Sequence, residues 1–578
     1  MSRHPLAPLA LLALAPLAAG QALTERVSTQ SGGAQSNGPA GTDIHRAVAM
    51  DGDGRFVAFV AIADDLVPGD TNGVADVFVK DRQTGLVERV SLAAGGVQPD
   101  AKCQVVDLSS NGRFVVFQSF ATNLVAGDTN GWSDVFLHDR LTGVTERVSL
   151  ADDESEGNLN SESGCVSDDG NTIAFWSNAS NLVPGDTNGT GDIYLRDRAG
   201  MRTKRVSLPT PGTGVEGNGN CGTPTLSADG RFVAFATLSS NWVLGDGNAT
   251  WDVFVKDTQS QALEKVGPAF GTWHGASTAP WISPEGDFVA FVSTGDDVVV
   301  PDLNSATADV YLWRRAVGSV QRVSTSSGGA QADQASANPR VSQFGQVVVF
   351  ESDATNLVPG DTNAKTDVFA HDTQSGLTTR VSVGHQGAQG TQPSFHPGLS
   401  DDGMSVGFGS HAPNLVPDDT NFDADVFVHD RDYTTWTTYC TAKTNSLGCT
   451  SAISASGVPS ATGLSPCTVT GSLLVNNTVG IFLYSTTGPA AVPAMGGFLC
   501  VGAPFTRTPG AATGGTPPPT QDCSGALTFD LSGWVSGGND PALVPGQPLW
   551  GQFWSRDQGF TAPNNSNLTD GIALIVGP

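Results

Sequence analysis

The chain has 578 residues, with 57 Asp and Glu against 29 Lys and Arg, so its formal net charge at pH 7 is −28. Nucleic acids and anionic membrane surfaces are bound by clustered cations, and this balance argues against both classes of partner. Charged residues make up only 15% of the chain and glycines number 70, which is typical of a turn-rich, all-β protein.

The first 22 residues have the pattern of a secretory signal peptide. Arg3 and His4 precede an apolar stretch from Leu6 to Leu17, and small residues follow at 18–20 and at Ala22. This stretch is too short for a stable membrane anchor, and no cysteine follows it that could carry a lipid. No other stretch is apolar enough to span a membrane. We therefore expect a secreted, periplasmic or cell-surface protein, in which the eight cysteines favour disulfides.

Residues 23–439 repeat one unit of about 58 residues seven times. The segment LVPGDTNGVADVFVKDRQTGLVERVSL, from Leu66 to Leu92, returns in clear or weaker copies that start at Leu124, Leu182, Trp242, Val298, Leu357 and Leu415. A constant period of this size is typical of a repeat architecture, in which each unit is one supersecondary element.

The first unit contains four strand-like segments, 45–50, 56–61, 76–81 and 87–92. Four strands joined as a meander make one propeller blade, so the sequence predicts an all-β fold with a seven-bladed β-propeller. The two long connections of each unit alternate with short turns. We therefore expect both long loops on one face, which would be the binding surface for an unknown protein or glycan ligand of a monomeric protein.

The sequence leaves two ways of closing the ring. Thr24–Ser28 (TERVS) or Thr434–Tyr439 (TTWTTY) could supply the last strand of the seventh blade.

Units such as LSADGRFVAF…DVFVKD…RVS, from Leu226 onward, resemble the WD40-like PD40 repeats of TolB-type propellers over residues 24–439. The resemblance implies a propeller that serves as a binding platform, a periplasmic scaffold or an accessory domain of an enzyme.

Each unit carries an Asp-x-Asn motif with a further Asp just before its third strand. Asp and Asn oxygens on a tightly curled loop suit Ca²⁺, and the pattern resembles the Asp/Asn-rich loops of calcium-binding repeats, without their extra acidic residues. The other interpretation is a structural turn, because Asp and Asn bond to their own backbone two residues on. The loops are Asp70/Asn72/Asp76, Asp128/Asn130/Asp134, Asp186/Asn188/Asp192, Asp246/Asn248/Asp252, Asp302/Asn304/Asp309, Asp361/Asn363/Asp367 and Asp419/Asn421/Asp425.

The histidines give no catalytic motif. His138, His371 and His429 share a slot with Lys and Arg in other units, which predicts solvent exposure. Cys103 and Cys221 share an offset with His45, which we expect at the channel mouth. An extracellular polysaccharide-active enzyme, a lyase or glycosidase, would need channel residues around His45, His274 and His396. The sequence also shows no G-x-S-x-G element of a hydrolase.

From residue 440 the repeat stops, and 440–578 reads as a small antiparallel β-sandwich with disulfides. Strand-like segments include 471–484, 526–535 and 548–554. We expect Cys440–Cys449 and Cys500–Cys523 bridges, while a bridge from Cys467 to a propeller cysteine would balance the odd counts. The strings YCTAKTNSLGCT and FWSRD resemble a C-terminal module of large exported bacterial proteins.

The sequence thus favours an exported, non-catalytic binding or scaffold protein that uses the long-loop face of its propeller. Ca²⁺ is the only cofactor that we expect. The polysaccharide-active enzyme is one alternative. The other is a cell-surface structural module that is attached or sorted through the C-terminal domain.

Overall fold

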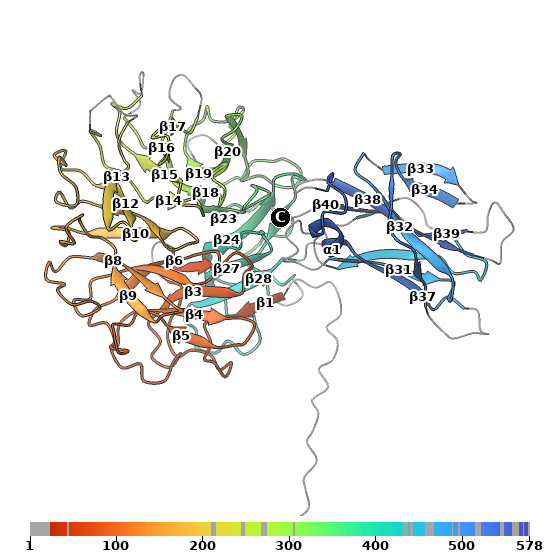
Figure 1. The fold of residues 1–578 in the computed structure, drawn as a ribbon, viewed down its shortest axis with the longest axis horizontal. Coiled ribbons are helices and arrows are strands. Elements are labelled where there is room, and N and C mark those ends of the chain that lie inside the picture. The colour runs from red at the N-terminus through yellow and green to blue at the C-terminus, as the bar shows by residue number, and fades with distance from the viewer. Residues whose placement is uncertain are drawn as a thin grey trace, which may run out of the picture.

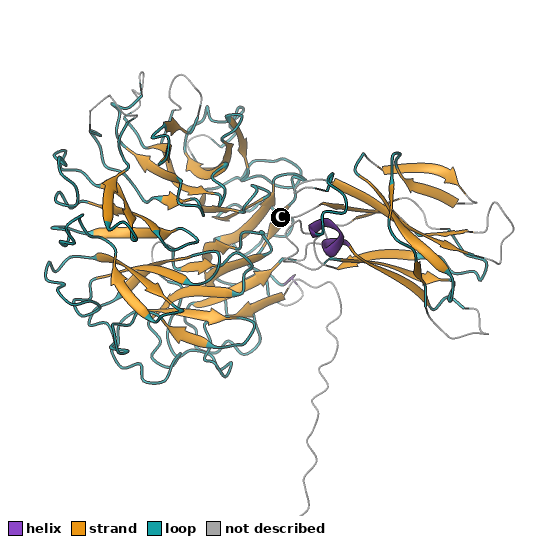
Figure 2. Cartoon of the chain, viewed as in Figure 1, coloured by secondary structure: helices purple, strands orange, loops and turns teal. Residues whose placement is uncertain are grey.

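The computed structural model describes residues 23–42, 46–209, 216–243, 249–267, 274–304, 307–384, 387–431, 437–439, 443–456, 467–487, 489–494, 497–514, 522–543, 548–557, 566–569 and 571–575. The predicted signal peptide lies outside them. Figure 1 shows two parts, the propeller and a smaller C-terminal domain beside it, and Figure 2 shows that strands dominate both. No helix in the described part of the chain is long and apolar enough to cross a membrane.

Within the described residues, 28 strands form seven four-stranded antiparallel sheets, the blades that the repeat predicts. The innermost strands are β2 (Val48–Met50), β6 (Cys103–Leu108), β10 (Ser161–Val166), β14 (Thr225–Leu226), β18 (Ser277–Ile282), β22 (Ser336–Val341) and β26 (Ser394–Leu399). The second strands are β3 (Phe56–Ala61), β7 (Phe114–Ser119), β11 (Thr172–Ser177), β15 (Phe232–Thr237), β19 (Phe288–Ser293), β23 (Val347–Ser352) and β27 (Ser405–Ser410).

The two outer strands of each blade carry the DVFVKD-like and ERVS-like segments. The third strands are β4 (Asp76–Asp81), β8 (Asp134–Asp139), β12 (Asp192–Asp197), β16 (Asp252–Asp257), β20 (Asp309–Arg314), β24 (Asp367–Asp372) and β28 (Asp425–Asp430). The outermost strands are β5 (Val87–Arg89), β9 (Val144–Arg147), β13 (Arg202–Arg205), β17 (Leu263–Lys265), β21 (Ser319–Arg322), β25 (Thr378–Arg380) and β1 (Leu23–Arg26).

The N-terminal strand closes the ring. β1 pairs antiparallel with β28, placing Leu23 opposite Asp430 and Arg26 opposite Phe427. The competing segment belongs to the other domain, because β29 (Thr437–Tyr439) pairs with β40 (Gly571–Ile575). Closure by Thr434–Tyr439 is therefore wrong. The last propeller strand ends at Asp430, so residues 437–439 belong to the C-terminal sheets rather than to the propeller.

Hydrogen bonds place the two long loops of a blade together, as predicted. In the first blade, Gln98 Nε2 donates to Gly69 O (2.6 Å) and Asn72 Nδ2 donates to Pro99 O (3.2 Å), joining the two loops. The short first-to-second turns meet around the axis at the other end, where Gly52 N donates to Ser110 O over 2.8 Å. The propeller therefore has a long-loop face and a short-turn face.

The blades are held together by apolar side chains of their middle strands. Phe59 on β3 stacks on Phe78 on β4 with ring centroids 5.9 Å apart, and the other blades repeat this aromatic pair. The turn glycine Gly112 has φ +69°, and a Cβ there would lie 2.4 Å from the Phe56 ring of the preceding blade. Only glycine combines this backbone with this close approach.

The C-terminal domain packs two sheets around one core. One sheet has the order β29-β40-β38-β32-β35, and the second is β30-β31-β37. Side chains from both sheets, such as Phe482, Phe553 and Val469, share the core. The strands are β30 (Ala452–Ser456), β31 (Thr468–Leu474), β32 (Val479–Ser485), β33 (Pro489–Ala494), β34 (Gly497–Val501), β35 (Thr506–Arg507), β36 (Ala511–Ala512), β37 (Gly525–Asp530), β38 (Pro548–Arg556), β39 (Ser566–Leu568) and β40.

Two of the expected strand-like segments are divided. Residues 471–484 span the end of β31 and most of β32, which are consecutive strands. Residues 526–535 contain β37 and then a short helix, α1 (Leu531–Ser536), whose N-cap Asp530 accepts from Gly533 N. The helix forms because the Asp530 carboxylate satisfies an amide of its first turn.

Both predicted disulfides are wrong. Cys449 pairs with Cys523, which joins the TNSLGC loop to the start of β37. Cys500 is also disulfide-bonded, and Cys440 lies outside the described residues. The proposed bridge between the domains is wrong as well, because Cys467 and the three propeller cysteines (103, 165 and 221) are buried free thiols. Spacing along the chain does not reveal which cysteines the sandwich brings together.

The two C-terminal strings meet in space. Asp557 of FWSRD is fully buried, and its carboxylate accepts from Ser446 N (2.7 Å) and from Ser446 Oγ (2.5 Å) in the TNSLGC loop. The Asn445 side chain caps the same loop, because its Oδ1 accepts hydrogen bonds of 3.0 Å from Leu447 N and from Cys449 N. These strings therefore fix a loop of the sandwich.

Candidate functional site

The Asp-x-Asn loops enclose a buried arginine. In the first blade, Arg89 Nη1 lies 2.8 Å from Asp70 Oδ1 and 3.3 Å from Asp76 Oδ2, and all three side chains are almost fully buried. Ser91 Oγ donates to Asp76 Oδ1 (2.6 Å), and Asn72 Nδ2 donates to Asp76 Oδ2 (2.9 Å). The loop and the ERVS strand are thus two halves of one polar cluster, which we call the rim cluster.

The rim cluster recurs around the ring. In four further blades one arginine pairs with both aspartates of the motif: Arg147 with Asp128 and Asp134, Arg205 with Asp186 and Asp192, Arg322 with Asp302 and Asp309, and Arg380 with Asp361 and Asp367. The signal in the sequence was the constant separation of about 19 residues between the first Asp and the basic residue.

Two blades vary the cation. In the fourth blade Lys265 pairs with Asp252, while Asp246 and Asn248 lie outside the described residues. In the seventh blade the cation is Arg26 from β1, 3.5 Å from Asp419 and 3.4 Å from Asp425. The cluster thus forms even where its basic residue comes from the opposite end of the propeller chain.

In five of the six described motifs the asparagine bonds within the fold through both ends of its amide. In the second blade, Asn130 Nδ2 donates to Asp134 Oδ2 and to Gly157 O, both over 3.0 Å. Its Oδ1 accepts from Trp132 N (2.7 Å), two residues on. This is the bonding of a structural turn, in which the asparagine bonds to the backbone two residues on.

The other blades repeat this bonding with small changes. Asn188 and Asn363 bond in the same way as Asn130. Each accepts a hydrogen bond of 3.0 Å from the backbone amide two residues further along the chain. Asn421 donates to Ser36 O (3.1 Å) and accepts from Asp423 N (3.1 Å). Asn304 donates to Ala332 O (2.9 Å) and to Asp309, but its buried Oδ1 has no partner among the described residues. The fifth loop, which is one residue longer, therefore departs from the pattern at this oxygen.

The charge balance of the rim cluster argues against a calcium ion at these loops. Burial raises the pKa of Asp76, and the bonds from Ser91, Asn72 and Arg89 oppose that rise. The guanidinium supplies the positive charge that a buried carboxylate pair requires. A calcium ion at these loops would have to displace it. Calcium binding stays a prediction, and the geometry favours the structural turn.

The slot shared by Lys, Arg and His is buried, contrary to the prediction of solvent exposure. Lys80 Nζ donates to Thr29 O (3.1 Å) and to Gln30 O (3.2 Å), while His138 Nδ1 bonds to Thr145 Oγ1 (2.8 Å). These side chains reach polar partners on the outer strand of their own blade or on the loop that precedes the blade, which is how a polar side chain is accommodated when buried. The slot contains Lys80, His138, Arg196, Lys256, His371 and His429.

The histidines proposed for an enzyme are not gathered in one place among the described residues. His274 is 81% exposed, with Nδ1 3.5 Å from Asp296 and 3.6 Å from Asp297. These three side chains form a metal-capable group that does not include His396, which lies on β26. His45 lies outside the described residues. Cys103 and Cys221 do not line the channel mouth, because they are buried against Ser119 and Thr237.

The propeller axis differs from the rim in its chemistry. One residue at an equivalent position on the innermost strand of each blade lines the axial cavity, and together they form what we call the axial ring: Ala49, Asp107, Cys165, Thr225, Trp281, Arg340 and Gly398. These seven equivalent positions carry seven different residues, whereas the rim clusters are near copies. Bulges in five innermost strands, such as the one between Ala337 and Arg340, precede this position.

Two members of the axial ring, Trp281 and Arg340, stack with Arg46 at the axis. The Arg340 guanidinium carbon lies 3.9 Å from the Trp281 ring centroid, and that of Arg46 lies 5.0 Å from it. Arg46 crosses from the first blade to donate to Pro224 O in the fourth. Both guanidiniums are more than nine-tenths buried. Burial and the neighbouring Arg46 cation lower the pKa of Arg340 to about 9, so it remains charged at neutral pH.

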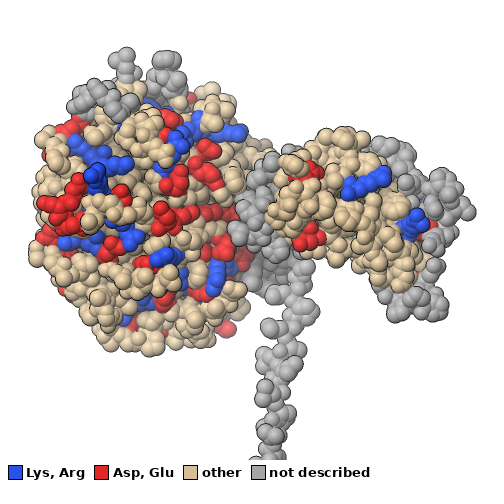
Figure 3. Space-filling view, in the orientation of Figure 1, with Lys and Arg blue, Asp and Glu red and all other residues tan. Residues whose placement is uncertain are grey.

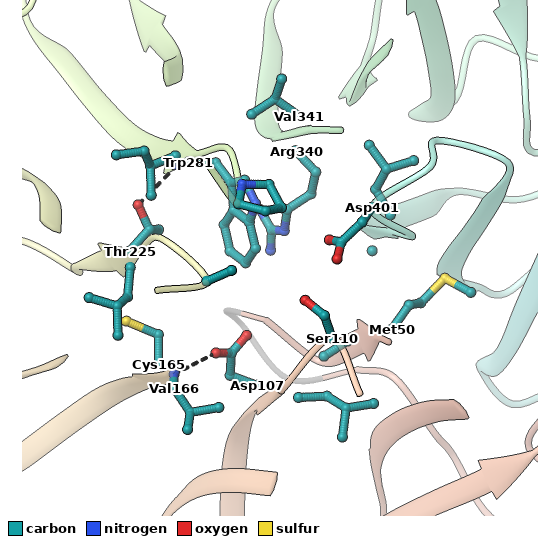
Figure 4. Close-up of a pocket in the computed structure, with 18 of the residues that line it drawn as sticks. Met50, Asp107, Ser110, Cys165, Val166, Thr225, Trp281, Arg340, Val341 and Asp401 are labelled. Atoms are coloured by element: carbon teal, nitrogen blue, oxygen red, sulfur yellow. Dashed lines mark hydrogen bonds between the residues drawn. The ribbon is translucent and has the colours of Figure 1, made fainter. Parts of the chain in front are cut away.

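Between the axial ring and the short turns lies a cavity of about 80 Å³. Figure 4 shows Asp107, Asp401 and Ser110 pointing into it, opposite Trp281 and Arg340. Asp107 Oδ2 accepts from Val166 N (3.0 Å). Burial and the nearby Asp168 raise the pKa of Asp401 to about 7. The cavity therefore combines an acidic side with a cationic side. Sequence reasoning missed it because it considered only histidines at the axis.

The long-loop face carries exposed apolar side chains. Phe422 is 82% exposed and has φ +61°. Other blades have residues in the same left-handed conformation at this loop position, but they are small: Gly73, Gly131, Gly189, Ala249 and Ala364. Other exposed apolar side chains of these loops are Ile62, Trp132, Val300 and Leu303.

No family model matches the chain, and no curated protein matches it. Among solved structures, oligogalacturonate lyase from Vibrio parahaemolyticus aligns at 11% identity over 71% of this chain and 94% of its own, with a TM-score of 0.44. A putative TolB from Agrobacterium tumefaciens aligns at 16% identity over 62% and 98%, with a TM-score of 0.34. The acylaminoacyl peptidase of Pyrococcus horikoshii aligns at 10% identity over 72% and 56%, with a TM-score of 0.40. The β-propeller fold is shown by the seven four-stranded sheets of the chain itself.

Proposed function

We propose that this protein is an exported, non-catalytic binding or scaffold protein whose long-loop face holds a protein or glycan partner. Export is supported by the signal-peptide pattern of residues 1–22 and by the Cys449–Cys523 disulfide. The binding role is supported by the long-loop face, and above all by Phe422.

A phenylalanine in the left-handed region costs free energy that glycine avoids, because glycine has no Cβ atom. Phe422 recovers none of it by packing within the chain, because its side chain is almost fully exposed. Backbone strain of this kind persists where a side chain serves a purpose outside the fold. Exposed aromatic side chains are also the groups that most often dominate binding energy at interfaces.

The propeller surface also carries many charged side chains of both signs. Figure 3 shows Asp and Glu interspersed with Lys and Arg over the visible face of the propeller, whereas most of the visible C-terminal domain is uncharged. Many of the propeller charges pair with each other, as Arg55 does with Asp81 over 2.7 Å. A partner is therefore better anchored by the exposed apolar side chains than by net charge.

The test compares two triple variants of the mature protein. The first removes the long-loop anchors with Trp132→Ser, Leu303→Ser and Phe422→Gly. The matched control removes three equally exposed apolar side chains from the turns between third and fourth strands, at the short-turn end, with Leu141→Ser, Met201→Ser and Val317→Ser. Each protein is immobilised and presented to a glycan array and to the extracellular and envelope fractions of its source, with quantitative detection.

We expect the wild-type and control proteins to retain the same partner, and the long-loop variant to lose it at least about tenfold, as expected for interface anchors. Equal retention by both triple variants would contradict the use of the long-loop face. Turnover of an oligosaccharide on the array by the wild-type protein would contradict the non-catalytic role and support the polysaccharide-active alternative.

A further inference from the structure

The axial cavity has opposite charges on its two sides within a small volume. On one side, Arg340 is 8% exposed and donates one hydrogen bond, from Nη1 to Pro339 O (2.9 Å). Its remaining N–H groups have no acceptor among the described residues. A guanidinium has five donors, and a buried one normally finds acceptors for most of them. Arg340 lines the cavity, so these donors are available to a ligand.

On the other side, carboxylates converge. The Asp107 oxygen that is not bonded to Val166 N and the Asp401 carboxylate both point into the open space, with the Ser110 hydroxyl between them (Figure 4). Asp168 lines the same side of the cavity. These oxygens come from the first turns and innermost strands of the second, third and seventh blades, so the ring closure itself assembles them.

We propose that this cavity binds a small zwitterion, a free α-amino acid, with its carboxylate on Arg340 and its ammonium group between Asp107, Asp401 and Ser110. A simple anion would satisfy Arg340 but meet the carboxylates, and a simple cation would do the reverse. A molecule that carries both charges a few ångströms apart satisfies both sides. This proposal concerns the short-turn face and does not depend on the partner of the long-loop face.

Size limits the ligand to the smallest members of this class. A cavity of about 80 Å³ corresponds to roughly five to eight water positions, which suits a molecule of about six non-hydrogen atoms. Glycine and alanine fit within this volume. Entry is from the short-turn face, where Asp168, Ala228 and Asp401 are all partly exposed.

The direct test is calorimetric titration of the mature protein with glycine and L-alanine, supported by thermal unfolding. We expect saturable binding and a rise in Tm of about 2 °C near saturation, because the ligand binds only the folded state. Acetate carries the carboxylate alone and methylammonium the ammonium group alone. We expect both to bind at least about tenfold more weakly, since each leaves one charged side without its partner.

Two variants locate the site. Arg340→Gln removes the cationic side, and Asp401→Asn removes charge from the partly exposed acidic side with little change in shape. We expect each to weaken alanine binding about tenfold. The matched control is Asp229→Asn, in the equivalent turn of the fourth blade, where the exposed carboxylate only accepts from Ser227 Oγ and Arg231 N. This control should bind alanine as the wild-type protein does.

Several outcomes would overturn the proposal. The first is no saturable binding of either amino acid. The second is acetate, methylammonium or an inorganic cation binding as tightly as alanine, which would mean that one side alone forms the site. The third is unchanged alanine binding by a folded Asp401→Asn variant, which would place the ligand elsewhere even if Arg340→Gln failed to fold.

Discussion

The rim and the axis of the propeller are built from the same seven repeats but follow different rules. At the rim, the same Asp, Asn, Ser and basic residues recur with nearly the same hydrogen bonds in each blade whose loop is described. At the axis, equivalent positions hold seven different residues. Repetition at the rim accompanies a structural task that each blade must perform alone. Because the axial positions differ from blade to blade, the cavity that they line is asymmetric, as the proposed zwitterion site requires.

Removing β1 would break the rim most severely. Deleting residues 23–28 takes away the fourth strand of the seventh blade together with Arg26 and Ser28, and leaves Asp419 and Asp425 buried without their cation. We expect more than about 5 kcal/mol of destabilisation and loss of the cooperative propeller transition, because a strand edge and two buried charges are left unpaired. Thermal unfolding and limited proteolysis measure this, with Glu25→Gln as the control. A deletion protein that melts like the wild type would contradict closure by β1.

A single rim cluster can be broken with Arg89→Met. The change leaves Asp70 and Asp76 buried without a counter-charge, and we expect about 3–5 kcal/mol of destabilisation in denaturant unfolding. The control is Arg55→Met in the same blade, whose solvent-exposed guanidinium pairs with Asp81, so we expect a much smaller loss of stability than for Arg89→Met. Equal effects of the two changes would show that the rim cluster is no more important than a surface ion pair.

The buried slot makes stability depend on pH. Burial lowers the pKa of His429 to about 4, whereas an unfolded histidine takes up its proton near pH 6.5. The contribution of His429 is therefore present above pH 6.5 and is lost as the pH falls toward 4. Relative to His429→Gln, we expect the wild-type protein to lose about 2–3 kcal/mol of unfolding free energy over this range. Identical pH profiles of the wild-type and His429→Gln proteins would contradict the burial of this imidazole.

The strained long-loop position predicts a gain in stability. Replacing Phe422 by glycine, the residue found there in three other blades, should raise the unfolding free energy by about 1 kcal/mol by relieving the left-handed backbone. Denaturant midpoints at unchanged slope measure this gain. A loss of stability would show that Phe422 packs within the chain and would remove the main support for the binding face.

Chelation should have the smallest effect. Because arginine or lysine already compensates the rim carboxylates, we expect excess chelator to shift Tm by less than about 1 °C relative to added Ca²⁺. A clear fall in Tm on chelation would instead support the calcium hypothesis. Asp76→Asn combined with Asp134→Asn, which changes two of the seven loops, should then reduce that fall, and this second measurement separates loop-bound calcium from calcium bound elsewhere.

The sequence predicts the propeller well because its signals are local and repeated. The alternation in DVFVKD and the glycine turns place the strands of each blade within a few residues. Pairings between distant segments cannot be predicted from local pattern. TERVS and TTWTTY are both strand-like, and only the tertiary register selects the first. The partners of Cys449 and of Asp76 are likewise set by the fold rather than by local pattern.

The functional site was harder to predict for a physical reason. Lys80 and His138 are polar residues in a strand, and exposure is their usual state. Their burial depends on acceptors supplied by the preceding loop and the outer strand. The axial ring depends on bulges that turn side chains toward the axis, and a bulge is not visible in a period-two pattern.

Closure of the ring by β1 also determines the order in which the molecule can be completed. Ser28 and its partner Asp425 are separated by 397 residues, so the first strand to be synthesised must wait for almost the whole propeller before it finds its place. Until then each new blade can pack only against its predecessor, and the axial cavity has no complete wall. Until β1 pairs with β28, the propeller is therefore an open ring with two unpaired ends. This last pairing closes the ring and completes the wall of the axial cavity.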